Sequence, residues 1–408
     1  MLIGAIGDDF TGSGDLANML ARAGLRVDLL TQMPAAALAT QAEAVVIALK
    51  TRTNPIADAV AQSLEAMRWL RAQGAERILF KYCSTFDSTR TGNIGPVAEA
   101  LAKELDARQV LFVPSFPETG RTVYQGHMFV GDRLLSESPL AHHPLTPMTD
   151  PDLRRWLGYQ TGVRVGGLPL SVLRGPDAGA YLAALDAAFV VADAIDDRDI
   201  DRLGLLVRDA PLVTGGSAIG AGLARALVGD RGNAQSGWQG VGGPAVVLSG
   251  SCSAATLGQI AAYYGPLRQV AVAEVLDNPA LPEALADWAI QAGNAPLIAV
   301  SQPPEQVLAT QAAYGRERTA DAIDAMFARL ASALVARGVT RLVVAGGETS
   351  GAVTLGLGLE RLQVGPQIAP GVPALASGGL RLALKSGNFG GPDFFGRAVA
   401  ILGDDHAG

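Results

Sequence analysis

The opening of the chain carries more acid than a glycine-rich turn usually does. The stretch GDDFTGSGD, Gly7 to Asp15, holds three aspartates and three glycines and no lysine or arginine. Carboxylates at the end of a strand can bind sugar hydroxyls, hold Mg²⁺ through water, or take the proton of an attacking hydroxyl. Asp8 and Asp9 are therefore the candidate catalytic residues. An aspartate here can also cap the following helix, with Thr11 or Ser13 as alternative caps.

The same turn fits the dinucleotide pattern G-x-G-x-x-A at Gly12, Gly14 and Ala17. Two aspartates would then place negative charge where a pyrophosphate should lie, which argues against this interpretation. The chain has no Gly-Lys dipeptide, so a Walker loop is absent as well. An NAD-dependent hydroxy-acid dehydrogenase stays open as an alternative function, as does a non-catalytic acid-sugar binding protein.

Polar and cationic side chains follow several neighbouring strands that the sequence predicts. The stretch KYCSTFDST, residues 81–89, is the densest cluster and suits a polyol or hydroxy-acid site. A turn that bonds its own backbone is the alternative for such residues. Cys83 has no partner base in the sequence, so we expect it to pack rather than react. The candidate substrate-binding residues are Arg52, Lys81, Ser84, Thr85, Asp87, Arg121 and His127.

Three turns rich in glycine and small polar residues occur in the second half, at 248–256, 343–353 and 385–395. Their backbone amides and hydroxyls can cradle a phosphate without a lysine, and Thr349 or Ser350 can cap the following helix. One such turn is ordinary in an α/β protein, but three in one domain favour a phosphate-bearing ligand. The candidate nucleotide-binding residues are Ser251, Ser253, Gly346, Gly347, Glu348, Thr349, Gly387 and Gly390.

Alternating strands and helices must position these turns. Apolar runs predict strands, and helical spacing of apolar residues predicts helices between them, an order typical of a mostly parallel sheet. Ligands bind beyond the carboxyl ends of such strands, where the candidate residues lie. The predicted strands cover 2–7, 44–49, 77–82, 110–115, 187–195, 211–216, 245–250, 297–300, 341–347 and 382–387, and the predicted helices include 55–73 and 95–106.

The chain is long enough for two α/β domains. A proline-rich stretch from about 126 to 175 is too long for a simple connection and predicts a functional segment or a subdomain. Residues 228–244 break all periodicity and contain six glycines, so we place the boundary there, between domains at 1–228 and 244–408. We expect the ligands to meet in the cleft between these domains, which would close over them.

Composition excludes several classes of protein. The net charge is −7 and no basic face is evident, so nucleic acid is an unexpected partner. The two cysteines and four histidines lack zinc or disulfide spacing. No apolar run has the roughly 20 residues that a membrane span needs, and no basic segment precedes an N-terminal apolar run. We therefore expect a cytoplasmic protein with a small-molecule partner.

The motifs together resemble one family, the four-carbon acid sugar kinases, and most closely its 3-oxo-tetronate kinases. The resemblance extends from about residue 3 to 395 and is most specific in FPETGRTVYQGHMFVGDRLLSESPLAHHPLTPMTD. The other motifs that carry it are GDDFTGSGDLA, ALKTRT, KYCSTFDST, GNIGPV, GSCSAAT, GGETSGAV and KSGNFGGPDFF.

This resemblance implies that the first domain binds the acid sugar, the second binds ATP, and the terminal 4-hydroxyl of the substrate is phosphorylated. Such a kinase needs a cationic site for the substrate carboxylate, an aspartate for the attacking hydroxyl, and Mg²⁺ with backbone amides for the phosphates. The expected ligands are the acid sugar, ATP and Mg²⁺. The metal ligands, the stereochemistry of the substrate and the formation of a homo-oligomer stay open.

Overall fold

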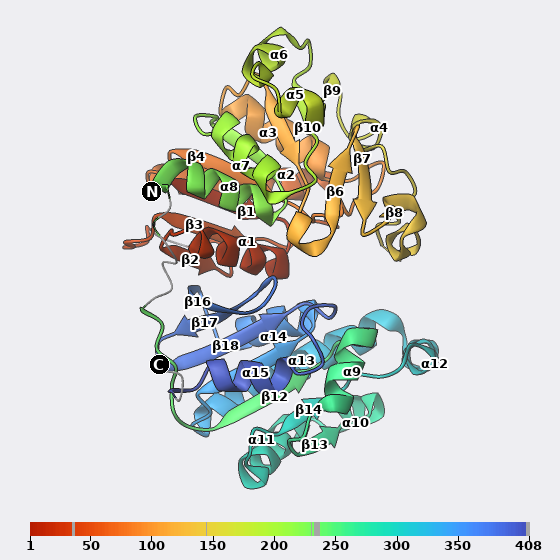
Figure 1. Cartoon of the computed structure of the whole chain (residues 1–408). Helices are drawn as coiled ribbons and strands as arrows, with labels where there is room; N and C mark the ends of the chain where they lie inside the picture. The colour runs from red at the N-terminus through yellow and green to blue at the C-terminus, as the bar shows by residue number, and fades with distance from the viewer. Residues whose placement is uncertain (35–36, 144, 230, 232–236, 405–408) are drawn as a thin grey trace. The chain divides into compact units, whose positions relative to one another are not determined.

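A computed structural model describes residues 1–34, 37–143, 145–229, 231 and 237–404. The chain divides into two compact units, Met1–Ser236 (unit 1) and Gly237–Gly408 (unit 2). Both are α/β, as the alternation of apolar runs predicted, and Figure 1 shows the strands and helices of each. Within the described ranges, no helix is long and apolar enough to cross a membrane.

In unit 1, parallel strands form a sheet in the order β2-β3-β1-β4-β11-β5-β10-β9. These strands are short and, apart from the edge strand β9, almost entirely buried, as expected of a parallel sheet covered on both faces. Their bounds are β1 Ile3–Gly7, β2 Val27–Leu30, β3 Ala44–Ala48, β4 Arg77–Lys81, β5 Val110–Val113, β9 Val165–Leu168, β10 Phe189–Ala192 and β11 Leu212–Gly215.

Helices cover both faces of this sheet. Ile78 and Phe80 of β4 belong to a core cluster that includes apolar residues of α2 and α3. Leu79 points to the other face, because side chains alternate along a strand, and there it lies near Gly220 of α8, which also abuts Leu16 of α1. The helices of unit 1 are α1 Phe10–Arg22, α2 Ile56–Ala72, α3 Ile94–Glu104, α4 Leu153–Gly158, α5 Leu170–Leu173, α6 Ala178–Ala184, α7 Asp197–Leu206 and α8 Ser217–Val228.

A small antiparallel sheet, β6-β7-β8, follows β5. The turn between its first two strands is held by Asp193, which is 1% exposed and accepts hydrogen bonds from the backbone of Gln125, Gly126 and Leu170. The predicted segment from 126 to 175 thus divides: its start joins the small sheet, and its end supplies β9 to the main one. The bounds are β6 Arg121–Tyr124, β7 His127–Val130 and β8 Arg133–Leu134, with 3₁₀ turns η1 Pro117–Thr119, η2 Leu135–Glu137 and η3 Pro139–His142.

In unit 2 the strand order is β13-β14-β12-β15-β18-β17-β16. Five neighbouring strands are mutually parallel, namely β13, β14, β12, β15 and β18. Strand β17 runs antiparallel to both β18 and β16. Sequence patterns missed β13, β16 and β17. The glycine and prolines of β16 and β17 are typical of loops. Gly365 in β16 instead gives room to the Trp238 ring. The bounds are β12 Ala245–Ser249, β13 Leu267–Gln269, β14 Leu297–Ala299, β15 Arg341–Ala345, β16 Arg361–Ala369, β17 Val372–Ser377 and β18 Leu380–Lys385.

The helices of unit 2 follow its strands as the parallel order requires, with α9 directly after β12 and α14 directly after β15. Phe394 and Phe395 of α15 pack in the core against β12, β15 and β18. The bounds are α9 Ala254–Ala262, α10 Val272–Asp277, α11 Leu281–Ala292, α12 Pro304–Tyr314, α13 Arg316–Ala336, α14 Gly347–Gly356 and α15 Phe394–Ile401.

Candidate active site

Strand register brings the candidate residues of unit 1 to one edge of the sheet. Gly7, the last residue of β1, pairs with Ala48 of β3 and Lys81 of β4, and Lys81 pairs with Gly215 of β11. These strands therefore end at the same level, and the segments that follow them lie next to one another. The predicted juxtaposition of GDDFTG, KTRTN and CSTFDST arises from this alignment.

Asp8 is buried and holds Arg52 in a two-bond fork. Its carboxylate oxygens accept from Nε and Nη2 of Arg52 at 2.9 and 2.8 Å. Its backbone carbonyl accepts from the amides of Thr51 and Arg52, so the acidic turn fixes the loop as well as the guanidinium. Burial raises the pKa of Asp8 despite the opposing charge of Arg52. The pKa of Arg52 is raised, since the two neighbouring carboxylates outweigh its own burial.

Asp9 is the N-cap of α1 and also contacts Arg52. Its Oδ1 accepts from the backbone amide of Gly12 at 3.1 Å and lies 2.9 Å from Arg52 Nη2, while Oδ2 accepts from Thr11 Oγ1 at 2.9 Å. The cap is therefore Asp9 and not Thr11 or Ser13. Although burial opposes it, the charges of Arg52 and Lys81 hold the pKa of Asp9 below its usual value. The Asp9 side chain is 27% exposed against 5% for Asp8, so it is the more accessible carboxylate.

Lys81 and Asp15 are buried beside this turn. Lys81 Nζ donates to the Tyr82 carbonyl at 2.7 Å, and a Cβ added to Gly12 would lie 2.9 Å from that nitrogen. Asp15 accepts from Ser217 Oγ, in the first turn of α8, at 2.5 Å, and its Oδ1 is buried without a partner among the described residues. Burial raises the pKa of Asp15, with Lys81 opposing the rise. Asp15 thus links α1 to α8.

Several side chains of the polar turn 83–89 contact one another within the turn. Thr85 donates to Asp87 at 2.6 Å and contacts Cys83 Sγ, and Phe86 adopts φ 58°. Ser88 is buried and accepts from Trp156 Nε1 and Gln160 Nε2, so it anchors α4 to the turn. Burial raises the pKa of Cys83 to about 12, which makes a poor nucleophile at neutral pH and agrees with a packing role.

Asn93 is an organising residue that sequence patterns did not single out. Its Nδ2 donates to the carbonyls of Thr51, Arg52 and Asn54 at 2.7, 3.3 and 2.9 Å and so shapes the loop that carries Arg52. The only signal was its place in GNIGPV. A small cavity lies beside it, lined by Asp8, Thr51, Arg52, Phe80, Asp87, Ser88, Asn93, Ile94 and Val97.

Arg121 and His127 lie on the small sheet rather than on the strand ends of the main one. Arg121 Nη1 donates to the Thr119 carbonyl, and its Nε is buried without a partner in the described part of the chain. His127 Nδ1 donates to the Gln125 carbonyl at 2.8 Å. Register therefore brings Arg52 and Lys81 to the acidic turn, while no hydrogen bond or ion pair among the described residues joins Arg121 or His127 to it.

In unit 2 the three glycine-rich turns converge. A Cβ on Gly387 would collide with Ser251 Oγ, and one on Gly250 would collide with Thr349 Oγ1. Gly346 has φ 124°, a backbone conformation that residues with a side chain rarely adopt. A Cβ there would lie 3.3 Å from the Ser251 amide nitrogen. The turns that follow β12, β15 and β18 thus approach one another at distances that only glycine permits.

The helices that begin at these turns are capped differently. Ser253 caps α9 by accepting from the Thr256 amide at 3.2 Å, and it donates to the Gly387 carbonyl at 2.7 Å. The N-cap of α14 is Gly346, which has no side chain to cap it, and Thr349 and Ser350 lie inside the helix instead of capping it. The first amides of α14 are therefore left for another acceptor, such as a phosphate.

Lys385 is the second functional candidate that sequence patterns missed. It ends β18, is 0% exposed, and donates to Thr256 Oγ1 and to the carbonyls of Ser386 and Gly387 at 2.9, 3.1 and 2.9 Å. Burial lowers the pKa of this lysine to about 8. The third turn, residues 385–395, thus begins with a buried lysine that donates to carbonyls of the turn itself.

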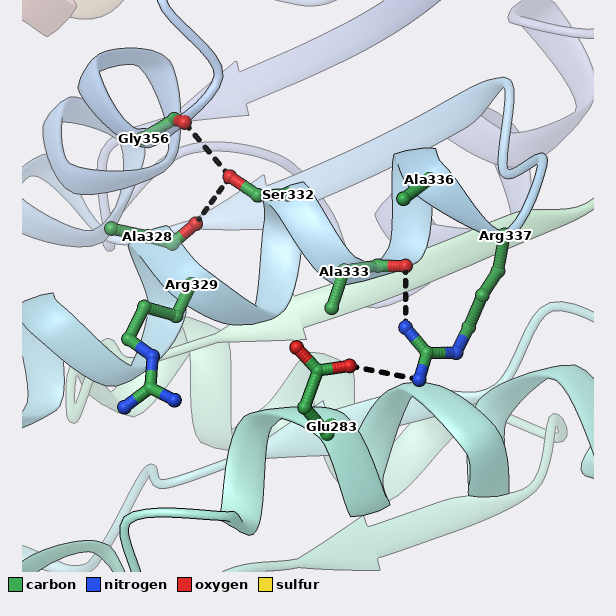
Figure 2. Close-up of a pocket in the computed structure, with 8 residues that line it drawn as sticks. All are labelled: Glu283, Ala328, Arg329, Ser332, Ala333, Ala336, Arg337 and Gly356. Atoms are coloured by element: carbon green, nitrogen blue, oxygen red, sulfur yellow. Dashed lines mark hydrogen bonds and ion pairs between the residues drawn. The ribbon is translucent and has the colours of Figure 1, made fainter.

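A separate groove runs between α11, α13 and the end of α14 (Figure 2). Ser332 donates to the carbonyls of Ala328 and Gly356 there, and Arg337 pairs with Glu283 at 2.8 Å. The groove lies at the end of α13 that leads into β15. It also borders the end of α14 that is remote from the Gly346 turn. Since ligands of parallel sheets bind beyond the carboxyl ends of strands, we do not assign the active site to this groove.

No preformed metal cage is found in the ranges that the structure describes: no group of three or more His, Cys, Asp or Glu side chains there could hold an ion. Asp8 and Asp9 are instead both paired with Arg52.

Two family models match the chain, one in each unit. Residues 3–223 match a sugar-binding N-terminal domain, and residues 246–395 match a nucleotide-binding C-terminal domain. The acidic turn and its partners fall within the first range, and the converging turns fall within the second. The chain therefore belongs to the class of proteins that combine a sugar-binding domain with a nucleotide-binding domain.

Individual relatives narrow the class. The 3-oxo-tetronate kinase of Cupriavidus necator is 49% identical and covers 98% of this chain and 97% of its own, and that of Methylobacterium radiotolerans is 49% identical and covers 98% and 99%. A solved structure from Salmonella typhimurium LT2 matches with a TM-score of 0.90 at 44% identity over 97% of this chain and 98% of the other. The chain belongs to the 3-oxo-tetronate kinase family.

Proposed function

We propose that the protein is an ATP-dependent kinase that phosphorylates the 4-hydroxyl of a four-carbon 3-oxo acid sugar, giving the 4-phosphate and ADP. The observation that carries the proposal is the likeness to 3-oxo-tetronate kinases over 98% of the chain, which includes the polar turns of both units. The geometry agrees with it: acidic and cationic side chains gather in unit 1, and turns suited to phosphate gather in unit 2.

The substrate carboxylate requires a cation, and the cationic side chains of unit 1 differ in which of their donor nitrogens are already paired with protein atoms. Arg52 already uses Nε and Nη2 on Asp8 and Asp9, so we assign it to positioning these carboxylates. Arg121, with an unpartnered Nε, and Lys81 are left to face the substrate carboxylate. Ser84, Thr85, Asp87 and His127 supply polar groups for the hydroxyls and the 3-oxo group.

We assign distinct roles to the two aspartates. Asp9 is more exposed and has a lowered pKa, so it is ionised at neutral pH and can accept a hydrogen bond from the 4-hydroxyl. Asp8 is buried, and its carboxylate holds the Arg52 guanidinium in place. A phosphoryl-transfer transition state is loose, so orienting the hydroxyl matters more than a strong base, and a carboxylate of low pKa suffices.

The nucleotide belongs, in this proposal, to the converging turns of unit 2. Amides of the Gly346–Thr349 turn and hydroxyls of Ser251 and Ser253 bind the phosphates, and Gly387 and Gly390 let the third turn approach them. Glu348 is exposed in the first turn of α14 and is the carboxylate available to Mg²⁺ carried by ATP. When bound, Mg²⁺ neutralises the charge that develops on the phosphoryl oxygens.

A coupled assay of ADP release tests the function. With ATP and Mg²⁺, a panel of four-carbon 3-oxo acids and hydroxy acids should give turnover with at least one 3-oxo-tetronate, and the product should carry phosphate on C4. ADP release with none of the panel would overturn the proposal. A change at the nicotinamide absorbance band with NAD would favour the dehydrogenase, and sugar binding without ADP release would favour the non-catalytic protein.

A further inference from the structure

Each unit ends a central strand with a buried lysine. Lys81 is the last residue of β4 and is 3% exposed, and Lys385 is the last residue of β18 and is 0% exposed. Each Nζ donates to the carbonyl of the next residue, Tyr82 or Ser386. The two lysines occupy corresponding places, so the difference in their surroundings is informative.

Lys81 has compensating negative charge, whereas Lys385 lacks it. Asp8, Asp9 and Asp15 all interact electrostatically with Lys81. The hydrogen-bond acceptors of Lys385 are neutral, and no carboxylate forms an ion pair with it among the described residues. The carboxylates of α14 and of the turn before α15, Glu348 and Asp393, are both exposed. The other titratable groups on the elements around Lys385 carry no negative charge at neutral pH: Arg341 of β15, Arg381 of β18, Arg397 of α15, Cys252 before α9 and Tyr263 after it.

A buried ammonium without a counter-ion is unfavourable, and proteins usually pair such a charge or let it lose its proton. The position of Lys385 indicates what provides the missing negative charge. It donates to the Gly387 carbonyl, the same carbonyl that Ser253 and Thr256 contact, at the point where the third turn meets Ser251. A triphosphate in these turns would supply several negative charges close to Nζ.

We propose that Lys385 is the buried counter-charge of the nucleotide site and a positioning residue for its third turn, taking up a proton when the phosphates of ATP or ADP bind. This inference rests on the proposed function. Lys385 is already hydrogen-bonded to protein atoms, so it acts through charge and through the turn, not as a direct phosphate ligand.

The sign of the pH effect follows from the pKa. Burial lowers the pKa of Lys385 to about 8 in the free protein, so the lysine is mostly neutral at pH 8.5. Phosphates stabilise its charged form and raise its pKa, and binding at pH 8.5 should therefore take up as much as about three quarters of a proton. Nucleotide affinity should fall as the pH rises through 8.

Calorimetric titration of the whole protein with MgADP, at pH 8.5 in two buffers of different ionisation enthalpy, measures this uptake. Wild type should take up protons, and Lys385→Met should not and should bind at least about tenfold more weakly. Lys385→Arg keeps the charge without titrating, so it should bind without uptake and retain more affinity than Lys385→Met. Lys103→Met, at an exposed lysine of unit 1, is the matched control and should behave as wild type.

The outcomes separate the two proposals. MgADP binding to wild type without proton uptake would overturn the role of Lys385 and leave the kinase standing. Unchanged affinity and uptake in Lys385→Met would do the same. If the wild-type protein bound neither MgADP nor MgATP, the proposed function itself would fail, and this inference with it. The wild-type measurement decides the matter even if a variant fails to fold.

Discussion

At the scale of single residues, the candidate active site of unit 1 depends on one arginine shared by two carboxylates. Arg52 contacts Asp8 through two bonds and Asp9 through one, which lets two acids lie next to each other in the chain without leaving a buried charge unpaired. The environments of the two then diverge: burial raises the pKa of Asp8 more than Arg52 lowers it, whereas at Asp9 the opposing effect of burial is exceeded by the charges of Arg52 and Lys81 together with hydrogen bonds. Neighbouring residues of the same type thereby acquire different chemistry.

Asp9→Asn tests the proposed catalytic role of the Asp9 charge separately from its role as helix cap. Asparagine caps a helix about as well as aspartate, so α1 should remain intact while the carboxylate is lost. We expect kcat to fall by about 10²-fold or more, with the KM for ATP nearly unchanged. Steady-state kinetics and the midpoint of thermal unfolding measure the two effects.

Asp186→Asn is the control for that substitution, since its side chain is 93% exposed and pairs with Arg164 far from the turn in sequence. It should leave kcat unaltered. An Asp9→Asn enzyme that turned over at the wild-type rate would show that Asp9 is only a cap, and the role of orienting the hydroxyl would then have to pass to another group.

At the scale of elements, strand ends and glycine-rich turns determine which candidate residues lie close together. Register aligns the ends of β1, β3, β4 and β11 in unit 1, and in unit 2 Ala345 pairs with both Ser249 and Lys385. The turns that follow are close-packed because glycines stand where a Cβ would collide. Glycine is therefore required in these turns by the short distances between neighbouring turns as well as by backbone conformation.

Gly387→Ala tests this constraint. The added methyl group would meet Ser251 Oγ and Ser253 Oγ, so the third turn must shift away from the first. We expect the KM for ATP to rise at least about tenfold, roughly 1.4 kcal/mol of binding free energy, with the KM for the acid sugar unchanged. Initial-rate kinetics with each substrate varied in turn will show the difference.

The matched variant is Gly379→Ala in the turn between β17 and β18, where a Cβ would meet nothing within 4 Å. It should have wild-type kinetics. Equal effects of the two substitutions on the KM for ATP would indicate a general response of unit 2 rather than a collision in the nucleotide turns.

At the scale of the whole molecule, each unit contains a core and a polar centre of its own. Unit 1 concentrates carboxylates and cations around Asp8, and unit 2 concentrates hydroxyls, amides and a buried lysine around Gly387. This division predicts that the two substrates leave separate footprints on the chain.

Hydrogen exchange of the full-length protein measures these footprints. MgADP should protect amides at 250–256, 346–350 and 386–390, and the acid sugar should protect amides at 8–15, 50–54 and 83–88, because bound ligands suppress the local opening that exchange requires. Peptides of α11, remote from both sets of turns in the chain, serve as the internal reference. Protection by MgADP confined to 8–15 would reverse the assignment of the units.

The sequence by itself determined the α/β class, most strand positions and the family resemblance that the comparisons confirmed. It could do so because apolar periodicity is a local property and the motifs are contiguous. It also indicated the polar turns, since residues after parallel strands gather at one edge of a sheet.

Only the tertiary structure decided what individual side chains do. Asp8 meets Arg52 across 44 positions, and Lys385 meets Thr256 across 129, so neither contact is visible in local sequence. The loop held by Asn93 and the shifted pKa of Lys385 depend on such contacts and on burial. Charge and solvation are set by neighbours in space, and this is why residue types could be predicted while their protonation and partners could not.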